Sequence, residues 1–284
     1  MHPSDYLGNR QLSFIPCNLQ HNLHDSLMGH SLLLCNDDGI YADGMHHLYH
    51  ALRPSHTCTI IAPDRERSAA GHAITLTDPI KTKEIYHDEE RYGLAVSGTP
   101  ADCIKLALCH LHKKNPPALV VSGINLGSNL GISVLYSGTV SAASEAVILG
   151  IPGVAISLCT YENPEWETAA YVAQEVTRRL IEDPLPQGVL LNVNVPNLPL
   201  HALKGLRRAH MGKSRFVERF SAHRDPQGNQ YYWLDGDMQC LEDDPNADVH
   251  VVQAGYASLT PIHINLTAQD SLDQLADWNT EYHA

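Results

Sequence analysis

Short runs of apolar residues recur along the chain at the spacing expected for a parallel sheet. Residues 32–35 form the first run, and similar runs occupy residues 58–62, 118–122, 153–158 and 188–195. Continuous apolar runs of this length are typical of strands that are buried on both faces. The pattern therefore predicts five buried strands.

Helices are predicted between these runs. Residues 45–52 place apolar side chains at the i, i+3, i+4, i+7 spacing of an amphipathic helix. Residues 99–113 begin with Thr-Pro-Ala-Asp, which has the form of a capped helix start. Two further helices are predicted over residues 137–150 and 164–181.

The alternation of strands and helices predicts an α/β fold. We expect a Rossmann-like, doubly wound and mostly parallel sheet with right-handed connections. Residues 28–200 would form this core, with a β-hairpin excursion at residues 74–97. Ligands of such sheets bind outside the carboxyl ends of the strands. The polar loops after the first three apolar runs are therefore the expected location of a functional site.

The C-terminal residues, 201–284, differ from this core. A basic and aromatic stretch at 203–236 predicts a long hairpin, followed by extended structure at 249–266 and a short helix at 271–279. A basic-aromatic hairpin is compatible with nucleic-acid binding, but an arm for subunit association is the favoured interpretation.

The first 27 residues are polar and show no apolar periodicity. They contain no basic region followed by an apolar core, so they do not resemble a signal peptide. We expect a disordered extension at 1–27 and a single domain at 28–284. Met28 is then an alternative start to Met1.

The composition of the chain limits the kinds of molecule that it is expected to bind. The chain has 32 acidic and 19 basic residues, a formal net charge of −13, and 43% hydrophobic residues. An acidic globular surface disfavours stable binding to nucleic acid or to an anionic membrane. No apolar run approaches the ~18 residues of a membrane helix. An anionic substrate would have to be attracted by a local cation or a helix terminus.

Cysteine and histidine usage adds two expectations. Seven scattered cysteines, with no C-x-x-C pair, predict a reducing compartment and hence a cytoplasmic protein. His46, His47 and His50 have the spacing of one exposed helix face, and no cysteine or carboxylate pattern completes a zinc set. We interpret them as surface histidines.

The segment Asn36-Asp37-Asp38-Gly39 directly follows the first apolar run. Two adjacent carboxylates at the end of a buried strand lose hydration and repel each other, so they need a compensating partner. A divalent cation is such a partner, because hard oxygen ligands suit it. A polar Asx turn at the end of the strand explains this stretch equally well.

Three loops combine into one candidate site. Asp37 and Asp38, Ser68, and Asn125 lie in the loops after the first, second and third runs, which meet at one edge of the predicted sheet. Two carboxylates, a hydroxyl and an amide oxygen form an all-oxygen set suited to one Mg²⁺ or Mn²⁺ ion per subunit. We predict that Asp37, Asp38 and Asn125 are catalytic through this ion.

Helix starts near this edge are candidate anion sites. Ser137-Gly138-Thr139 offers free N–H groups and hydroxyls, and Thr99 offers a similar start. Asn129 lies in an adjacent loop rich in glycine and asparagine. N-capping is a role that Ser137 and Thr99 would fill in either case. A cation beside an anion-binding helix terminus is the combination used in phosphate-ester hydrolysis.

Several segments of the chain resemble the motifs of the SurE family, the stationary-phase survival proteins. The matching segments follow the family order: residues 36–39, 62–68, 96–102, 121–125, 136–140, 191–196 and 255–261. The resemblance covers roughly residues 30–280.

This resemblance implies a metal-dependent nucleotidase that hydrolyses nucleoside 5′-monophosphates, with 3′-monophosphates and short polyphosphate as further substrates. It implies metal ligation by Asp37, Asp38, Ser68 and Asn125, a cytoplasmic location, and a homodimer or homotetramer formed through the hairpin and tail. The chain departs from the family at residues 1–27, which have no counterpart. It also departs at 132–133, where Ile-Ser replaces the acidic residues of many members.

Two alternatives are open at this point. A non-catalytic nucleotide-binding regulator would use the same fold, although no G-x-G-x-x-G follows the first run and a fixed negative pair there repels a pyrophosphate. A phosphatase that forms an aspartyl-phosphate would normally space its carboxylates as D-x-D. Phosphate release from AMP in the presence of Mn²⁺ distinguishes the nucleotidase from the regulator.

Overall fold

A nine-stranded sheet organises residues 29–278, the part of the chain that the computed structural model describes. Its strands are β1 (Ser31–Cys35), β2 (Thr57–Pro63), β3 (Thr82–His87), β4 (Glu90–Val96), β5 (Leu119–Leu126), β6 (Gly153–Cys159), β7 (Val189–Pro196), β8 (Leu206–Arg208) and β11 (Ala257–His263). They lie in the order β3-β4-β2-β1-β5-β6-β7-β11-β8. The prediction of a disordered segment at 1–27, with Met28 as a possible start, falls outside the described residues.

The six central strands run parallel to one another; in spatial order they are β4, β2, β1, β5, β6 and β7. On either side of them, β3 pairs antiparallel with β4, and β11 pairs antiparallel with β7. Residues 32–34 of β1 are at most 1% exposed, because helices cover both faces of the sheet there. The predicted mostly parallel α/β sheet is therefore confirmed, as are the five strands expected from the apolar runs.

Five α-helices accompany the sheet in the described residues: α1 (Asp43–Leu52), α2 (Pro100–Leu106), α3 (Gly138–Ile148), α4 (Trp166–Glu182) and α5 (Asp248–Gln253). The predicted capped start of α2 is present, since the Thr99 hydroxyl accepts from the Asp102 N–H and the Asp102 carboxylate accepts from the Thr99 N–H. Short 3-10 segments occupy 131–135, 200–202, 269–271 and 273–278. Over residues 271–278, the described part of the expected terminal helix at 271–279, the chain therefore forms 3-10 turns.

The connection through α4 has an unexpected hand. The chain steps from β1 to β2 toward one edge of the sheet and from β6 to β7 toward the other, yet α1 and α4 pack against each other. α3, which joins β5 to β6, packs instead with α2. The β6–α4–β7 connection therefore has the opposite hand to the other two, and the expectation of right-handed connections throughout is wrong. Stacking of Trp166 on His47 helps to hold α4 on the α1 face.

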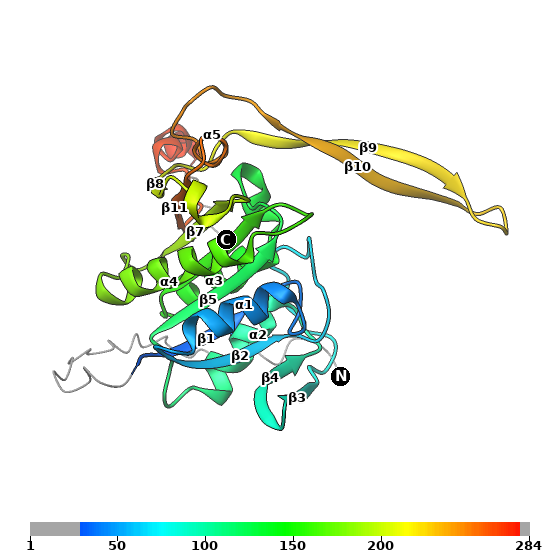
Figure 1. Ribbon diagram of the computed structural model, residues 1–284. Helices are drawn as coiled ribbons and strands as arrows, with labels where there is room; N and C mark the ends of the chain where they lie inside the picture. Colours follow the sequence, from blue (N-terminus) through cyan, green and yellow to red (C-terminus); the bar gives the residue numbers. More distant parts are fainter. Residues whose placement is uncertain (1–28, 279–284) are drawn as a thin grey trace, which may run out of the picture.

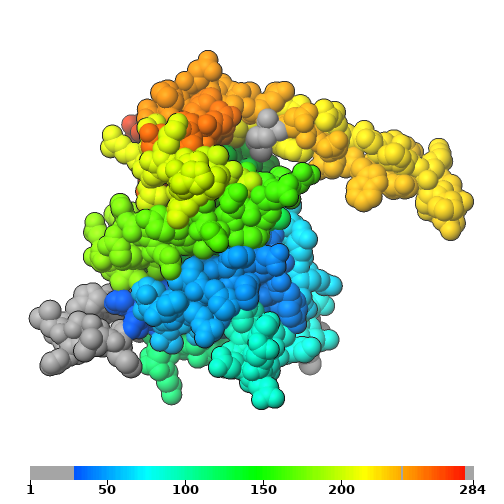
Figure 2. Space-filling view, in the orientation of Figure 1, coloured from blue at the N-terminus to red at the C-terminus, as the bar shows by residue number. Residues whose placement is uncertain are grey.

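A two-stranded antiparallel hairpin, β9 (Ser214–Arg224) and β10 (Gln230–Cys240), projects from the body of the molecule (Figures 1 and 2). The turn at residues 225–229 lies where Asp-Pro-Gln-Gly predicts it. The predicted extended structure at 249–266 is wrong for residues 249–253, which form α5. A helix of only six residues is too short for its periodicity to be recognised in the sequence.

No helix in the described part of the chain is both long and apolar enough to cross a membrane.

Candidate active site

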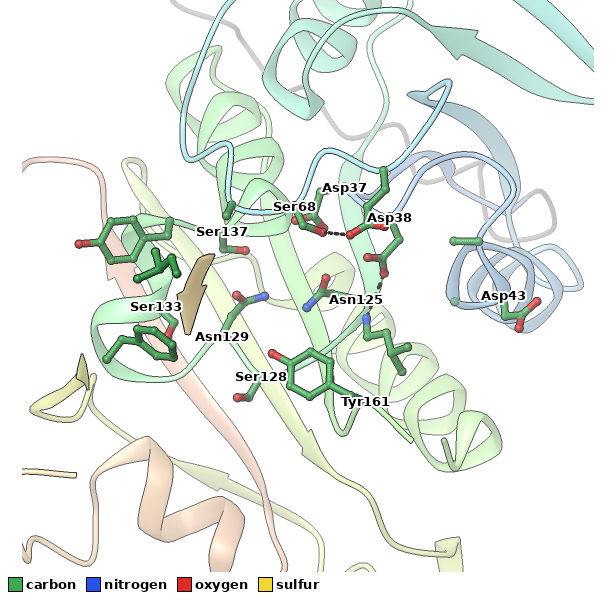
Figure 3. Close-up of a pocket in the computed structure, with 18 of the residues that line it drawn as sticks. Asp37, Asp38, Asp43, Ser68, Asn125, Ser128, Asn129, Ser133, Ser137 and Tyr161 are labelled. Atoms are coloured by element: carbon green, nitrogen blue, oxygen red, sulfur yellow. Dashed lines mark hydrogen bonds between the residues drawn. The ribbon is translucent and has the colours of Figure 1, made fainter. Parts of the chain in front are cut away.

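A cavity of about 780 Å³ opens at the carboxyl ends of β1, β5 and β6. Asp37, Asp38, Ser68 and Asn125, the four residues of the predicted cation site, all line it. Figure 3 shows the side chains of Asp37, Asp38 and Ser68 close together, with Asn125 beside them. The structure thus brings together residues that are separated by up to 88 positions in the sequence, as the strand-end argument predicts.

The turn after β1 presents the two carboxylates. The Asn36 side-chain oxygen accepts from the Gly39 N–H at 3.0 Å, so the Asx turn is present as well as the carboxylate pair. Gly39 has φ +99°, and a Cβ there would lie 3.0 Å from the carbonyl carbon of Arg65. Only glycine satisfies both the left-handed backbone and this close approach. The Arg67 N–H donates to the Asp37 carbonyl at 2.7 Å, which ties the Ser68 loop to the same turn.

Asp37 is buried against the start of α3. Its side chain is 4% exposed, receives a hydrogen bond from the Thr139 hydroxyl, and interacts with the backbone N–H groups of Gly138 and Thr139. A Cβ on Gly138 would lie 2.7 Å from the Asp37 Cβ. The predicted anion site at the α3 terminus is therefore engaged by a carboxylate of the chain itself, with Thr139 and Gly138 positioning Asp37.

The other three side chains keep oxygen atoms available to the cavity. Asp38 Oδ2 accepts from the Leu126 N–H at 3.0 Å, and the Asn125 amide nitrogen donates to the Gly127 carbonyl at 2.7 Å. Because its nitrogen is engaged, Asn125 has its amide oxygen free to bind a cation. The Ser68 hydroxyl donates to Glu66 at 2.8 Å, which leaves its oxygen lone pairs free.

The charged side chains that line the cavity are all acidic. Five carboxylates line it, those of Asp37, Asp38, Asp43, Glu66 and Glu218, and no Lys, Arg or His is among the described residues that do so. Burial raises the pKa of Asp37 despite the hydrogen bonds from the α3 terminus. Burial, helped by the nearby charges of Asp37 and Glu66, raises the pKa of Asp38 to about 6, although the hydrogen bond from the Leu126 N–H lowers it. The site is therefore built to receive positive charge.

In EDTA, Asp38→Asn should stabilise the protein at pH 7. A carboxyl whose pKa is raised on folding opposes folding above the folded pKa of about 6, and this cost disappears as the pH falls toward the unfolded value of 3.8. We expect a gain of ~1–2 kcal/mol after allowance for solvent screening of this partly exposed group. Urea unfolding at pH 7 and at pH 4 measures it, and the gain should shrink at the lower pH. An equal effect of the substitution at both pH values would contradict the cost assigned to Asp38.

Asn129 is anchored by a buried polar network that sequence reasoning missed. Its N–H donates to the Asn194 side chain at 2.8 Å, its carbonyl accepts from Asn192 at 2.8 Å, and its side-chain nitrogen donates to Ser157 at 2.8 Å. Because these bonds use the amide nitrogen, the amide oxygen of Asn129 is left for the cavity, which the residue lines. The signal in the sequence is the pair of asparagines, two residues apart, inside the apolar run of β7.

Two further buried carboxylates support the loops around the cavity. Asp248 on α5 accepts from the backbone N–H groups of Gly131, Gly212 and Val249 at 2.9–3.0 Å. Glu145 on α3 bonds His72 at 2.8 Å and Lys105 at 2.6 Å. Burial raises the pKa of Glu145, but these two partners hold it below its ordinary value. His72, near the site in sequence, is thus engaged with Glu145.

The helix-start residues fall in two different places. Ser137 lines the cavity and caps α3, with its hydroxyl accepting from the Val140 N–H at 3.1 Å. Thr99 caps α2, and its hydroxyl donates to the Ala73 carbonyl at 2.7 Å. The structure does not bring Thr99 to the cavity, so N-capping and loop support are the roles that its contacts give it.

The rest of the cavity is apolar and aromatic. Tyr161 and Trp166 lie on the loop and helix that follow β6, and Tyr136 precedes α3. Phe216 and Leu234 belong to the hairpin, Phe216 near its base and Leu234 in its middle. The hairpin therefore contributes a wall to the site, which the sequence did not indicate. Aromatic rings beside the strand-end carboxylates suit a ligand with a planar ring, and a phosphate on that ligand would need a cation between it and the carboxylates.

The donor set fits a hard divalent cation. Asp37, Asp38, Ser68 and Asn125 supply carboxylate, hydroxyl and amide oxygens in an uncompensated acidic site, which is the chemistry that Mg²⁺ and Mn²⁺ prefer. Within residues 29–278, no group of three or more His, Cys, Asp or Glu side chains is arranged to hold a metal ion. The candidate centre contains two carboxylates, so its other ligands have to be neutral oxygens.

A family model and individual relatives of the chain point to the same protein family. Residues 32–218 match the family model described as "Survival protein SurE". The "5′-nucleotidase SurE" of Syntrophus aciditrophicus is 47% identical over 244 residues, which is 86% of this chain and 91% of that protein. The protein of the same name from Syntrophobacter fumaroxidans is 43% identical over 248 residues, 87% of this chain and 99% of that protein.

A solved structure agrees with the fold. The crystal structure of the SurE protein from Aquifex aeolicus superposes with a TM-score of 0.76 at 36% sequence identity, covering 87% of this chain and 99% of that one. The two chains therefore share the same overall α/β fold.

Proposed function

The chain belongs to the SurE family of 5′-nucleotidases, and we propose that it releases phosphate from nucleoside 5′-monophosphates with the help of one divalent cation per subunit. The ion would be Mg²⁺ or Mn²⁺, held by Asp37, Asp38, Ser68 and Asn125. The observation that supports this proposal most strongly is that all the charged side chains lining the cavity are acidic. A phosphate monoester carries negative charge, and five lining carboxylates would repel it unless a cation intervened.

The residues of the chain have distinct roles in the proposed reaction. Asp37, fixed by Thr139 and Gly138, and Asp38, fixed by the Leu126 N–H, would hold the ion at the end of β1. When bound, the ion supplies Lewis acidity that lowers the pKa of a water and stabilises charge on the phosphoryl group. Asn129 and Ser137, which line the same cavity, would orient the phosphate. The aromatic rings of the cavity would receive the nucleoside.

An aspartyl-phosphate mechanism is less compatible with the geometry. Asp37 is 4% exposed and its carboxylate is held by the Thr139 hydroxyl and the α3 terminus, which reduces its availability as a nucleophile. Asp38 would be committed to the cation. Attack by water is therefore the proposed route.

Removal of divalent cations should abolish activity. Purified protein treated with EDTA should release no phosphate from AMP, and added Mn²⁺ or Mg²⁺ should restore the rate. Asn125→Ala should lose less activity than a carboxylate substitution, and excess Mn²⁺ should partly restore it, because the variant still has three of the four ligands. Malachite-green detection of phosphate measures both effects.

Full activity in EDTA would contradict the cation. Binding of AMP without turnover, at every metal tested, would favour the alternative of a non-catalytic regulator. A panel of 3′-monophosphates and short polyphosphate, assayed alongside AMP, tests the wider substrate range that we propose. A cytoplasmic location is also part of the proposal, supported by the six free cysteines of the described residues.

We also propose that the protein is a homodimer or homotetramer built through the hairpin. Phe220, Tyr232 and Trp233 on β9 and β10 are 68%, 59% and 65% exposed. An isolated two-stranded hairpin is at best marginally stable in water, so a second copy of the chain covering these aromatic rings would explain their exposure. Figure 2 shows the hairpin extending beyond the body of the subunit.

Light scattering at micromolar concentration should give at least twice the 31.3 kDa mass of one chain. The double substitution Phe220→Ser and Trp233→Ser should lower the measured mass toward that of the monomer, because it removes the two most exposed aromatic rings of the hairpin. Tyr171→Ser, an exposed aromatic residue on α4, is the control and should leave the mass unchanged. A monomeric mass for the unmodified protein would contradict the assembly.

A further inference from the structure

A second cavity lies between α1 and the β3–β4 hairpin. It has a volume of about 290 Å³, and its lining includes His46, His50 and Arg53 from α1, and His87 and Tyr92 from the hairpin. It is distinct from the candidate active site, whose contribution from α1 consists of Asp43 and Gly44 at the start of the helix. The proposed nucleotidase reaction gives these histidines no role.

The histidine pair on α1 has the geometry of a chelate. His46 and His50 are one helical turn apart, and their ring centroids are separated by 4.2 Å with the planes tilted by 46°. Two imidazoles that bind one ion through nitrogen at ~2 Å have ring centres ~4–5 Å apart. The i, i+4 spacing places both rings on the same helix face without any change of backbone. The rings are thus already at the separation that a shared ion requires.

The surroundings of His50 favour a neutral imidazole ring. Burial lowers the pKa of His50, and the nearby positive groups of His46, Arg53, His47 and His87 lower it further. A neutral ring keeps the nitrogen lone pair that a metal ion needs.

Charge around the pair is balanced by carboxylates. Asp88 and Glu90 line the cavity, and Asp88 lies 3.4 Å from His87 Nδ1. Arg91 is paired with Glu84 at 3.2 Å, and Arg53 lies 5.2 Å from the centre of the Tyr49 ring. Both arginines thus have partners of their own, and acidic groups are at hand to offset the charge of a bound cation.

We propose that His46 and His50 bind one transition-metal ion, of the Zn²⁺, Ni²⁺ or Cu²⁺ class, on the outer side of α1. Imidazole ligands select these ions, whereas the oxygen ligands of the active site select Mg²⁺ or Mn²⁺. The site has two protein ligands, since no three-residue metal group is preassembled in the described chain, and water fills the other positions. His87, whose ring centroid is 6.4 Å from that of His46, is the nearest imidazole across the cavity.

Titration calorimetry with NiCl₂ in the presence of saturating Mg²⁺ tests the site. Wild-type protein should show a strongest Ni²⁺ site of one ion per subunit, and His46→Ala and His50→Ala should each weaken it at least ~10-fold, because each removes half of the chelate. His110→Ala, which removes another exposed histidine, is the control and should leave that site unchanged. Alanine at exposed positions of α1 favours the helix, so both variants should fold normally.

A second measurement guards against binding by unrelated histidines elsewhere in the chain. Ni²⁺ should raise the melting temperature of the wild type and of His110→Ala, and should raise it less in His50→Ala. Unchanged Ni²⁺ affinity and stoichiometry in His46→Ala and His50→Ala would overturn the proposal. Equal weakening in the His110→Ala control would do the same, because it would show binding dispersed over surface histidines.

Discussion

Asp38→Asn should lower the rate of phosphate release from AMP at least ~100-fold, a loss of ~3 kcal/mol of transition-state stabilisation. Asp37→Asn should have an effect of the same size. Each substitution preserves shape while removing one of the two charges that would hold the cation, and neither amide can replace a carboxylate as a strong ligand. Steady-state assays at several Mn²⁺ concentrations measure the loss and reveal whether it follows metal affinity.

Asp43→Asn is the matched control for charge. Asp43 lines the same cavity from the start of α1 but lies outside the proposed ligand set, so its replacement should change the rate by less than ~10-fold. Comparable losses in all three variants would indicate a general field effect in place of ligation. Isolation of a phosphoryl group covalently attached to Asp37 or Asp38 during turnover would overturn the water-attack route.

Asp248→Ala should destabilise the protein strongly. The Asp248 side chain is fully buried and accepts three backbone N–H groups, from Gly131, Gly212 and Val249. Alanine would leave all three without that acceptor, at a cost of ~3 kcal/mol or more in the free energy of unfolding. Gly131 ends the loop that carries Asn129, so the rate should fall as well. Urea unfolding and AMP turnover measure the two effects separately.

Asp244→Ala is the control for Asp248. Asp244 is an exposed aspartate in the same segment. Its side chain accepts hydrogen bonds from the nearby Asn246 at 2.8 Å and 3.2 Å and lies 3.7 Å from His210. Its replacement should change the free energy of unfolding by less than ~1 kcal/mol. Equal stability of Asp248→Ala and the wild type would show that water replaces the carboxylate without cost.

The strand-end site was predictable because its information is local. The apolar run that stops abruptly before Asp37 and Asp38 predicts a buried strand. It also predicts that the residues directly after this strand lie at the carboxyl edge of the sheet. The same logic applies to Ser68 after β2 and Asn125 at the end of β5. Parallel pairing then places these three segments side by side, whatever the details of the intervening chain.

Other parts of the site depend on contacts that no local pattern encodes. Asn192 and Asn194 are polar residues in a buried strand, and their partner Asn129 is more than 60 positions away. The same is true of Asp248 and Gly131, which are 117 positions apart. The sequence places Phe216 and Leu234 in a projecting arm, yet both residues line the cavity. Such long-range pairs become visible only when the path of the chain is known.

The reversed hand of the β6–α4–β7 connection gives the sheet two topological switch points instead of one. The helices after β1 and β5 leave toward opposite faces, and the helices after β5 and β6 do so again. A crevice opens wherever neighbouring strands send their chains apart. The first, between β1 and β5, contains Asp38 and Asn125, and the second, between β5 and β6, is bordered by Tyr161. The candidate active site therefore spans two gaps between strands, and the proposed nucleotide substrate would have room to lie across the edge of the sheet.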